Sequence, residues 1–133
     1  MATIFSKIVQ GEIPCHKIAE SEHYLAFLDI RPLKKGHTLV IPKKEVDYIF
    51  DIEDDALGGL MVFAKKVAAA LKSVIPCKRI GVAVIGLEVP HAHVHLVPIN
   101  SIADLSFEHG FLSMTQEELA AVAQEIRAAY EMV

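Results

Sequence analysis

The stretch VPHAHVHLVP, residues 89–98, places three histidines at strict two-residue spacing, namely His91, His93 and His95. Side chains alternate between the two faces of a β-strand, so residues two apart share one face. The three imidazoles are therefore expected to project together, while the apolar residues between them turn into a core. On a helix the same residues would fan around the axis and form no cluster. The alternation predicts a strand with a histidine cluster on one side.

Hydrophobic patterning along the rest of the chain predicts a small mixed fold. Helices are expected over residues 3–10, over residues 53–73, and after the capping box formed by Thr115 and Glu118. Besides the histidine stretch, strands are expected at residues 15–20, 24–30, 37–42 and 80–85. Short connections between consecutive strands favour an antiparallel sheet. The expected fold class is α+β, in a single domain that spans residues 1–133.

The long helix expected over residues 53–73 has an apolar surface wider than one stripe, because Val62 and Phe63 extend it. Such a helix is expected to be covered on two sides, once by its own sheet and once by a partner. The sequence therefore predicts a homodimer with this helix at the interface. Gly58 and Gly59 lie inside the helix at a cost of roughly 1 kcal/mol each relative to alanine, which suggests close approach of another backbone.

The composition is that of an ordinary globular protein and excludes several functional classes. The 133 residues are 53% hydrophobic and 23% charged, enough for one domain with a real core. A net charge of −4 argues against nonspecific nucleic-acid binding, but it does not exclude a nucleotide ligand. No apolar run reaches the roughly 18 residues of a membrane span. Cys15 and Cys77 lack metal-ligand spacing, so reduced thiols in a cytoplasmic protein are expected.

Three imidazoles on one face allow three interpretations. They could be half-exposed polar side chains with no further role. They could bind zinc, although residues 91–95 span about 13 Å of strand, so all three cannot reach one ion. Two of them could, with help from another histidine such as His37. Finally, one imidazole could act as a nucleophile, because histidine has a reference pKa of about 6.5 and forms covalent intermediates.

The run from His91 to Val97 resembles the signature of the histidine triad superfamily, in which three histidines alternate with apolar residues. Four upstream blocks are similar to conserved blocks of that family and come in the same order: Ile4–Val9, Gly11–Pro14, Ala26–Ile30 and Gly36–Lys44. The resemblance extends from about Thr3 to Ile99. It implies a five-stranded antiparallel sheet with a long central helix and a C-terminal helix, dimerising into a larger sheet.

The resemblance also implies an activity. Similar proteins cleave purine nucleoside phosphoramidates, adenylates or dinucleoside polyphosphates, with no cofactor and no catalytic metal. His93 would be the nucleophile that takes up the nucleotidyl group. His95 would lie near the phosphate and the leaving group. His91 and His37 would support the site, with the main chain at His91 orienting the His93 ring.

Substrate-binding residues follow from the same resemblance. Asp29 ends an apolar strand, a position that by itself favours a structural role, but it matches the family carboxylate that bonds the ribose hydroxyls. Main-chain N–H groups near Glu88 and Val89 would hold the phosphate. The base pocket would be lined by apolar side chains, namely Phe5, Ile8, Ile13, Leu28 and Ile30.

The sequence departs from the family pattern in two places. Leu87 and Glu88 stand near the triad where relatives commonly have a glycine-glutamine pair, and Leu87 cannot donate to a phosphate while Glu88 would repel one. A nucleotide-binding regulatory protein with weak turnover is therefore an alternative, as is a metal-dependent hydrolase using the histidine cluster. Some bacterial relatives bind zinc through an N-terminal Cys-x-x-Cys pair. Thr3 and Ser6 occupy those positions here, so no such site is expected.

Overall fold

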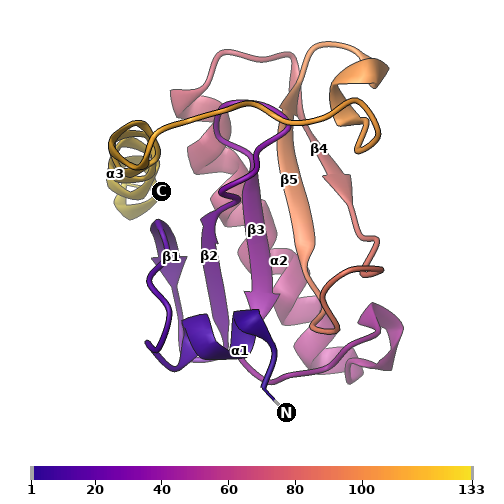
Figure 1. The fold of residues 1–133 in the computed structure, drawn as a ribbon. Helices are drawn as coiled ribbons and strands as arrows, with labels where there is room; N and C mark the ends of the chain where they lie inside the picture. Colours follow the sequence, from indigo (N-terminus) through magenta and orange to yellow (C-terminus); the bar gives the residue numbers. More distant parts are fainter. Residues whose placement is uncertain (1, 133) are drawn as a thin grey trace.

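The computed structural model describes residues 2–132, which form a five-stranded sheet with helices on both of its faces (Figure 1). The strand order is β1-β2-β3-β5-β4, and every neighbouring pair is antiparallel. The strands are β1 (Lys17–Glu20), β2 (Tyr24–Leu28), β3 (Thr38–Pro42), β4 (Arg79–Ala83) and β5 (Val94–Ile99). This confirms the expected α+β fold. The pairing of β5 with β3 places His95 beside Leu39, and its pairing with β4 places the same residue beside Ala83.

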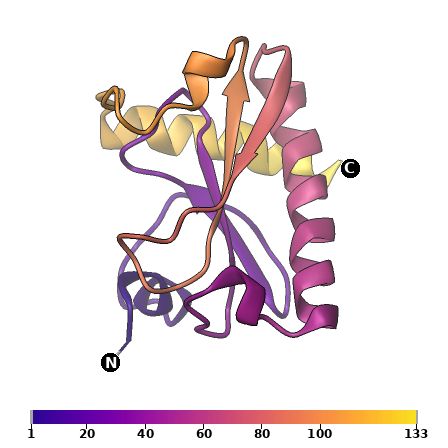
Figure 2. The same ribbon diagram turned by 90° about the vertical axis from the view of Figure 1, so that its right-hand side faces the viewer.

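The helices divide between the two faces of the sheet. Figure 2 shows α2 along one face and the short α1 on the other. The helices are α1 (Ile4–Val9), α2 (Asp54–Val74) and α3 (Gln116–Glu131), with 3-10 turns η1 (Ile49–Asp51) and η2 (Ile102–Leu105). The α3 helix packs against α2 and β1. It begins at the capping box that the sequence predicts, because Thr115 and Glu118 each bond the other's backbone N–H.

The main core fills the space between the sheet and the helices α2 and α3, and a smaller core lies under α1. Ala92, Val94 and Leu96 all belong to the main core, as the alternation in the histidine stretch predicts. The expected strand, however, begins later, at Val94. The Ala92 N–H donates to the Val46 carbonyl, at 2.7 Å, instead of to a neighbouring strand. His91 and His93 therefore stand on a non-strand segment that leads into β5.

The two glycines inside α2 have different surroundings. A Cβ at Gly59 would collide with the hydroxyl of Tyr24, which donates to the Ala56 carbonyl at 2.8 Å. A Cβ at Gly58 would meet nothing within 4 Å. Within the described part of this chain, a tyrosine side chain requires the space at Gly59, and no backbone of another segment is among the nearest contacts of either glycine. Within residues 2–132, no helix is long and apolar enough to span a lipid bilayer.

Candidate active site

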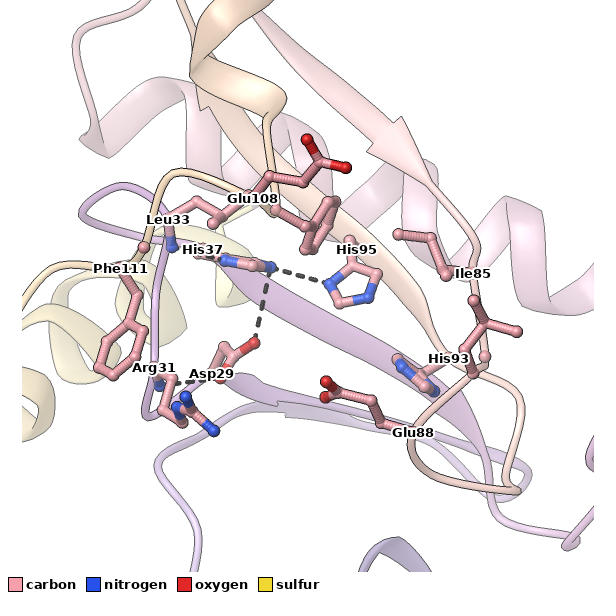
Figure 3. Close-up of a pocket in the computed structure, with 14 residues that line it drawn as sticks. Asp29, Arg31, Leu33, His37, Ile85, Glu88, His93, His95, Glu108 and Phe111 are labelled. Atoms are coloured by element: carbon pink, nitrogen blue, oxygen red, sulfur yellow. Dashed lines mark hydrogen bonds and ion pairs between the residues drawn. The ribbon is translucent and has the colours of Figure 1, made fainter.

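A cavity of about 500 Å³ opens on the face of the sheet opposite α2, and His37, His93 and His95 line it, whereas His91 does not (Figure 3). Asp29 comes from the end of β2, His37 from the residue before β3, and His95 from β5. His93 lies between His95 and the loop of residues 85–88. A second loop, residues 107–111, supplies the opposite wall. Strand pairing thus brings together residues that are far apart in the chain.

The ring of His93 has one nitrogen held by the backbone and one free. Its Nδ1 lies 2.7 Å from the carbonyl oxygen of His91. A carbonyl only accepts, so Nδ1 carries the proton and Nε2 keeps its lone pair. The edge of Phe5 packs against the ring, with centroids 5.0 Å apart, and leaves 7% of the residue exposed. The free Nε2 is therefore the nitrogen available for attack on a substrate.

A hydrogen-bonded chain fixes the protons of His37 and His95. The backbone N–H of Leu33 donates to Nδ1 of His37 at 2.9 Å, so the proton of this imidazole is on Nε2. That Nε2–H lies 2.9 Å from Nδ1 of His95 and donates to it. His95 consequently carries its own proton on Nε2. The backbone of one loop thus determines that His95 is a hydrogen-bond donor at its second nitrogen.

Both members of this chain are neutral at pH 7. Burial lowers the pKa of His37 to about 3, and the neighbouring His95 and His93 act in the same direction. Burial also lowers the pKa of His95 to about 4, with a further contribution from His93. A charged His37 would in addition point an N–H at the N–H of Leu33. Charge and hydrogen bonding therefore agree on the neutral forms.

Asp29 places a carboxylate in the wall of the cavity. Its Oδ1 accepts the backbone N–H of Arg31 at 2.9 Å, and its Oδ2 lies 3.7 Å from Nε2 of His37. Burial raises the pKa of this carboxyl, and the backbone bond from Arg31 opposes the increase. The side chain is 21% exposed, so Oδ2 remains accessible from the cavity. Both roles considered from the sequence are compatible, because one oxygen bonds the loop and the other is free.

The donor atoms of Asp29, His37 and His95 lie within 4.8 Å of one another, as metal ligands would. The positions of the protons on the two imidazoles argue against metal binding. A metal on Nε2 of His37 would move its proton to Nδ1, where the Leu33 N–H already donates. His91 could not join such a site, because its Nε2 lies 2.8 Å from the Pro42 carbonyl and its Nδ1 lies 3.1 Å from the Thr3 hydroxyl. The residues present fit a metal poorly.

Several expected base-pocket residues lie elsewhere. Leu28 is 2% exposed and belongs to the main core on the α2 side, so its expected place in the pocket was wrong. The reason is strand alternation, because Phe27 takes the site face of β2 and its neighbour must take the other. Phe5 and Ile8 do lie on the site face, in the smaller core under α1. Glu88 lines the cavity, whereas Val89 packs against that smaller core.

Ile13 lies in the segment between α1 and β1, and Ile30 lies in the loop after β2. Ile30 is 61% exposed, directly after Asp29, and Ile13 is partly exposed. Neither residue lines the cavity that contains the histidines. Their part in binding a base stays a prediction.

The loop of residues 107–111 supplies site residues that the sequence reasoning missed. The ring of Phe107 packs edge-on to His95, with centroids 4.7 Å apart. The guanidinium of Arg31 stacks on Phe111, 4.4 Å from the ring centroid. The segment has no hydrophobic period, so the sequence predicts no helix or strand there. The one available signal was two phenylalanines within an otherwise polar loop.

Comparisons with known proteins identify the family to which this chain belongs. The model of the HIT domain family matches residues 10–102. An adenosine 5'-monophosphoramidase of Schizosaccharomyces pombe is 36% identical over 129 residues, which cover 95% of this chain and 96% of that protein. The crystal structure of a Hit-like protein from Bartonella henselae is 31% identical, with a TM-score of 0.83 over 96% of this chain and 95% of that one.

A second solved structure extends the comparison. It is a zinc-bound histidine triad family protein from Mycobacterium smegmatis, 29% identical, with a TM-score of 0.84 over 99% of this chain and 95% of that one. Sequence, strand order and the histidine arrangement thus point to the same group of proteins. This chain belongs to the HIT domain family, the histidine triad proteins.

Proposed function

We propose that this protein is a nucleotidyl hydrolase that cleaves purine nucleoside phosphoramidates or adenylates through a nucleotidyl-histidine intermediate on His93. The observation that carries the proposal is the free lone pair on Nε2 of His93, fixed by the bond from Nδ1 to the His91 carbonyl. A nucleophile needs this tautomer, and here the backbone supplies it without an external base. The similarity to an adenosine 5'-monophosphoramidase supports the substrate class.

The reaction follows from the protons on the two facing rings. Nε2 of His93 attacks the α-phosphorus, and the bond to the leaving group breaks as the new P–N bond forms. The leaving group departs with the electron pair and takes its proton from water. The Nε2–H of His95 donates to the phosphoryl oxygen or the leaving atom, where charge develops. Water then attacks phosphorus, which frees the mononucleotide and restores His93.

The remaining binding roles are part of the same proposal. Oδ2 of Asp29 would accept from the ribose hydroxyls, since it has no bond to the loop. Main-chain N–H groups near Glu88 and Val89 would contact the phosphate. Phe5, which packs on the His93 ring, and Ile8 would support the nucleoside side of the site.

The charges around the cavity favour leaving groups that are neutral or singly charged, such as an amine or a carboxylate, over polyphosphates. The lining contains the carboxylates of Glu88 and Glu108 besides Asp29. Within residues 2–132, Arg31 is the only lysine or arginine in the lining, and it is stacked on Phe111. A second phosphate group would therefore meet more negative than positive charge.

Replacing Glu88 with glutamine tests this preference. We expect kcat/KM for diadenosine polyphosphate to rise about tenfold, because one unfavourable charge near the leaving group is removed. The value for an adenosine phosphoramidate with a neutral amine should change little. Steady-state assays of both substrates measure the ratio, and Glu22→Gln, a highly exposed site outside the cavity, is the control. Equal changes for both substrates would contradict the preference.

A second candidate function is a nucleotide-binding regulatory protein with weak turnover. Leu87 favours it, because this cavity residue is 89% exposed and its side chain offers a phosphate no hydrogen-bond donor. Titration with adenosine monophosphate and a hydrolysis assay across a substrate panel separate the two functions. Tight binding with no detectable hydrolysis of any substrate would select the regulatory protein.

We further propose that two copies pair through α2 and β4, giving one sheet across both subunits. β4 is an edge strand, and α2 packs against it. The outer surface of these elements carries exposed apolar side chains, with Val62 69% and Val82 50% exposed. Apolar side chains at an unpaired sheet edge commonly mark an interface between copies.

Sedimentation measures the pairing. We expect a mass twice that of the 14.6 kDa chain at micromolar concentration. Val62→Glu should give the single-chain mass, because the charge would be buried at the interface. Ile102→Glu places the same charge at a 94% exposed site on η2 and should leave the dimer intact. A single-chain mass for the unaltered protein would reject the interface.

A further inference from the structure

A polar network lies beside the cavity, on the same face of the sheet, at the start of α1. The hydroxyl of Thr3 accepts the N–H of Ser6 as the N-cap of that helix, at 3.0 Å. The same hydroxyl lies 3.1 Å from Nδ1 of His91. Glu45 contacts both Thr3 and Ser6, because its Oε1 accepts hydrogen bonds from the Thr3 N–H and the Ser6 hydroxyl. Thr3, Ser6 and the His91 ring are all buried.

The protons in this network have one consistent arrangement. Nε2 of His91 lies 2.8 Å from the Pro42 carbonyl, so it carries the proton and Nδ1 must accept. The Ser6 hydroxyl also lies 3.3 Å from Nδ1 of His91, but it gives its only proton to the closer carboxylate of Glu45. The remaining donor for Nδ1 is the Thr3 hydroxyl. A buried imidazole nitrogen without a donor is costly, so Thr3 stabilises one tautomer and one ring position of His91.

The His91 residue is also the partner of the nucleophile. Its backbone N–H donates to the Val89 carbonyl at 2.8 Å, and its carbonyl accepts from Nδ1 of His93. The second residue of α1 adds a further contact, because Phe5 packs edge-on to the rings of His91 and His93. The start of α1 therefore touches the nucleophile through packing and through one intervening histidine.

We propose that Thr3 is a positioning residue for the nucleophile, acting through the ring and carbonyl of His91 to hold His93 with its proton on Nδ1. The inference rests on the proposed function only for its effect on rate. The position of the protons is a property of the protein alone and is measurable without a substrate. Residues outside the cavity can set the geometry of a reacting group in this way.

The test compares two threonines that cap helices in the same way. Thr3→Ala and Thr115→Ala each remove a side-chain bond to the N–H three residues on, but only Thr3 contacts a histidine. We expect Thr3→Ala to lower kcat for an adenosine phosphoramidate about tenfold with KM nearly unchanged. Thr3→Ser, which keeps the hydroxyl, should restore kcat. Thr115→Ala should keep the kcat of the unaltered protein.

Nitrogen NMR of the imidazoles gives the readout that a merely structural role would not change. The unaltered protein should show His91 protonated on Nε2 and His93 on Nδ1, and Thr3→Ala should show mixed forms of both. A spectrum of the unaltered protein with the opposite forms would overturn the proposal without any variant. So would a Thr3→Ala protein with unchanged spectra and the kcat of Thr115→Ala.

Two other outcomes have their own tests, namely a Thr3→Ala protein that does not fold and an unaltered protein that has no activity. If Thr3→Ala does not fold, Thr3→Gly replaces it, because glycine is tolerated at N-caps and also lacks the hydroxyl. If the unaltered protein hydrolyses no phosphoramidate, the proposed function fails. The spectra of the Thr3 variants then still decide whether the network controls the protons of His93.

Discussion

His93→Ala is expected to lower kcat/KM for an adenosine phosphoramidate by at least about three orders of magnitude. The substitution removes a nitrogen that combines a free lone pair with a place in the cavity beside the neutral donor His95. Binding of adenosine monophosphate should weaken far less, because the proposed ribose contact at Asp29 stays in place. Stopped assays for turnover and calorimetry for binding measure the two effects.

Two controls make this result specific to the nucleophile. His23→Ala removes an imidazole that is largely exposed and outside the cavity, and it should retain full activity. Mass spectrometry of a quenched reaction should find the nucleotidyl group on the peptide that contains His93 and not on the His93→Ala protein. Retention of most activity in His93→Ala would reject the covalent mechanism.

Acid is expected to destabilise the fold through the neutral histidines of the site. Burial lowers the pKa of His37 to about 3 and of His95 to about 4, whereas both are near 6.5 in the unfolded chain. The unfolded state therefore binds more protons below pH 6.5, so stability present above that pH is lost as pH falls toward the folded pKa values. Between pH 6.5 and 5 the two groups together should remove roughly 3 kcal/mol from the free energy of unfolding.

Urea titrations at several pH values measure this loss. His37→Asn should reduce the pH dependence, because it removes one titrating group while keeping an oxygen that can accept the Leu33 N–H. His23→Asn removes a mostly exposed imidazole and should leave the slope unchanged. Glu20 has its pKa lowered to about 2 by Lys17 and Lys43, so its contribution begins near pH 4.5 and lies below the window. A flat profile between pH 6.5 and 5 would contradict neutral, buried rings.

Local patterns in the sequence predict most of the secondary structure. The α3 helix begins where Thr115 and Glu118 form a capping box, because capping depends on residues three apart. The strand before Asp29 was also expected. The expected pocket role of Leu28 was not correct, because the register of β2 points its side chain into the main core. The start of β5 was missed because it depends on Val46, which takes the N–H of Ala92 out of the sheet.

In the candidate site, too, local sequence patterns predict some features and not others. Alternation placed Ala92, Val94 and Leu96 in one core and turned the histidines away from it. The loop of residues 107–111 could not be placed, because no period relates it to the strands it covers. Its position depends on a bond between distant segments, from the Leu112 N–H to the Pro32 carbonyl at 2.7 Å.

By itself, the sequence determined that three imidazoles gather on one side of a small antiparallel α+β fold, because side-chain alternation is a local property of the backbone. Only the tertiary structure decided which nitrogen of each ring carries the proton. His37 takes its form from the Leu33 N–H, His91 from the Pro42 carbonyl, and His93 from the carbonyl of His91. An isolated imidazole has two similar neutral forms, so the partner that each nitrogen meets in the folded chain selects between them.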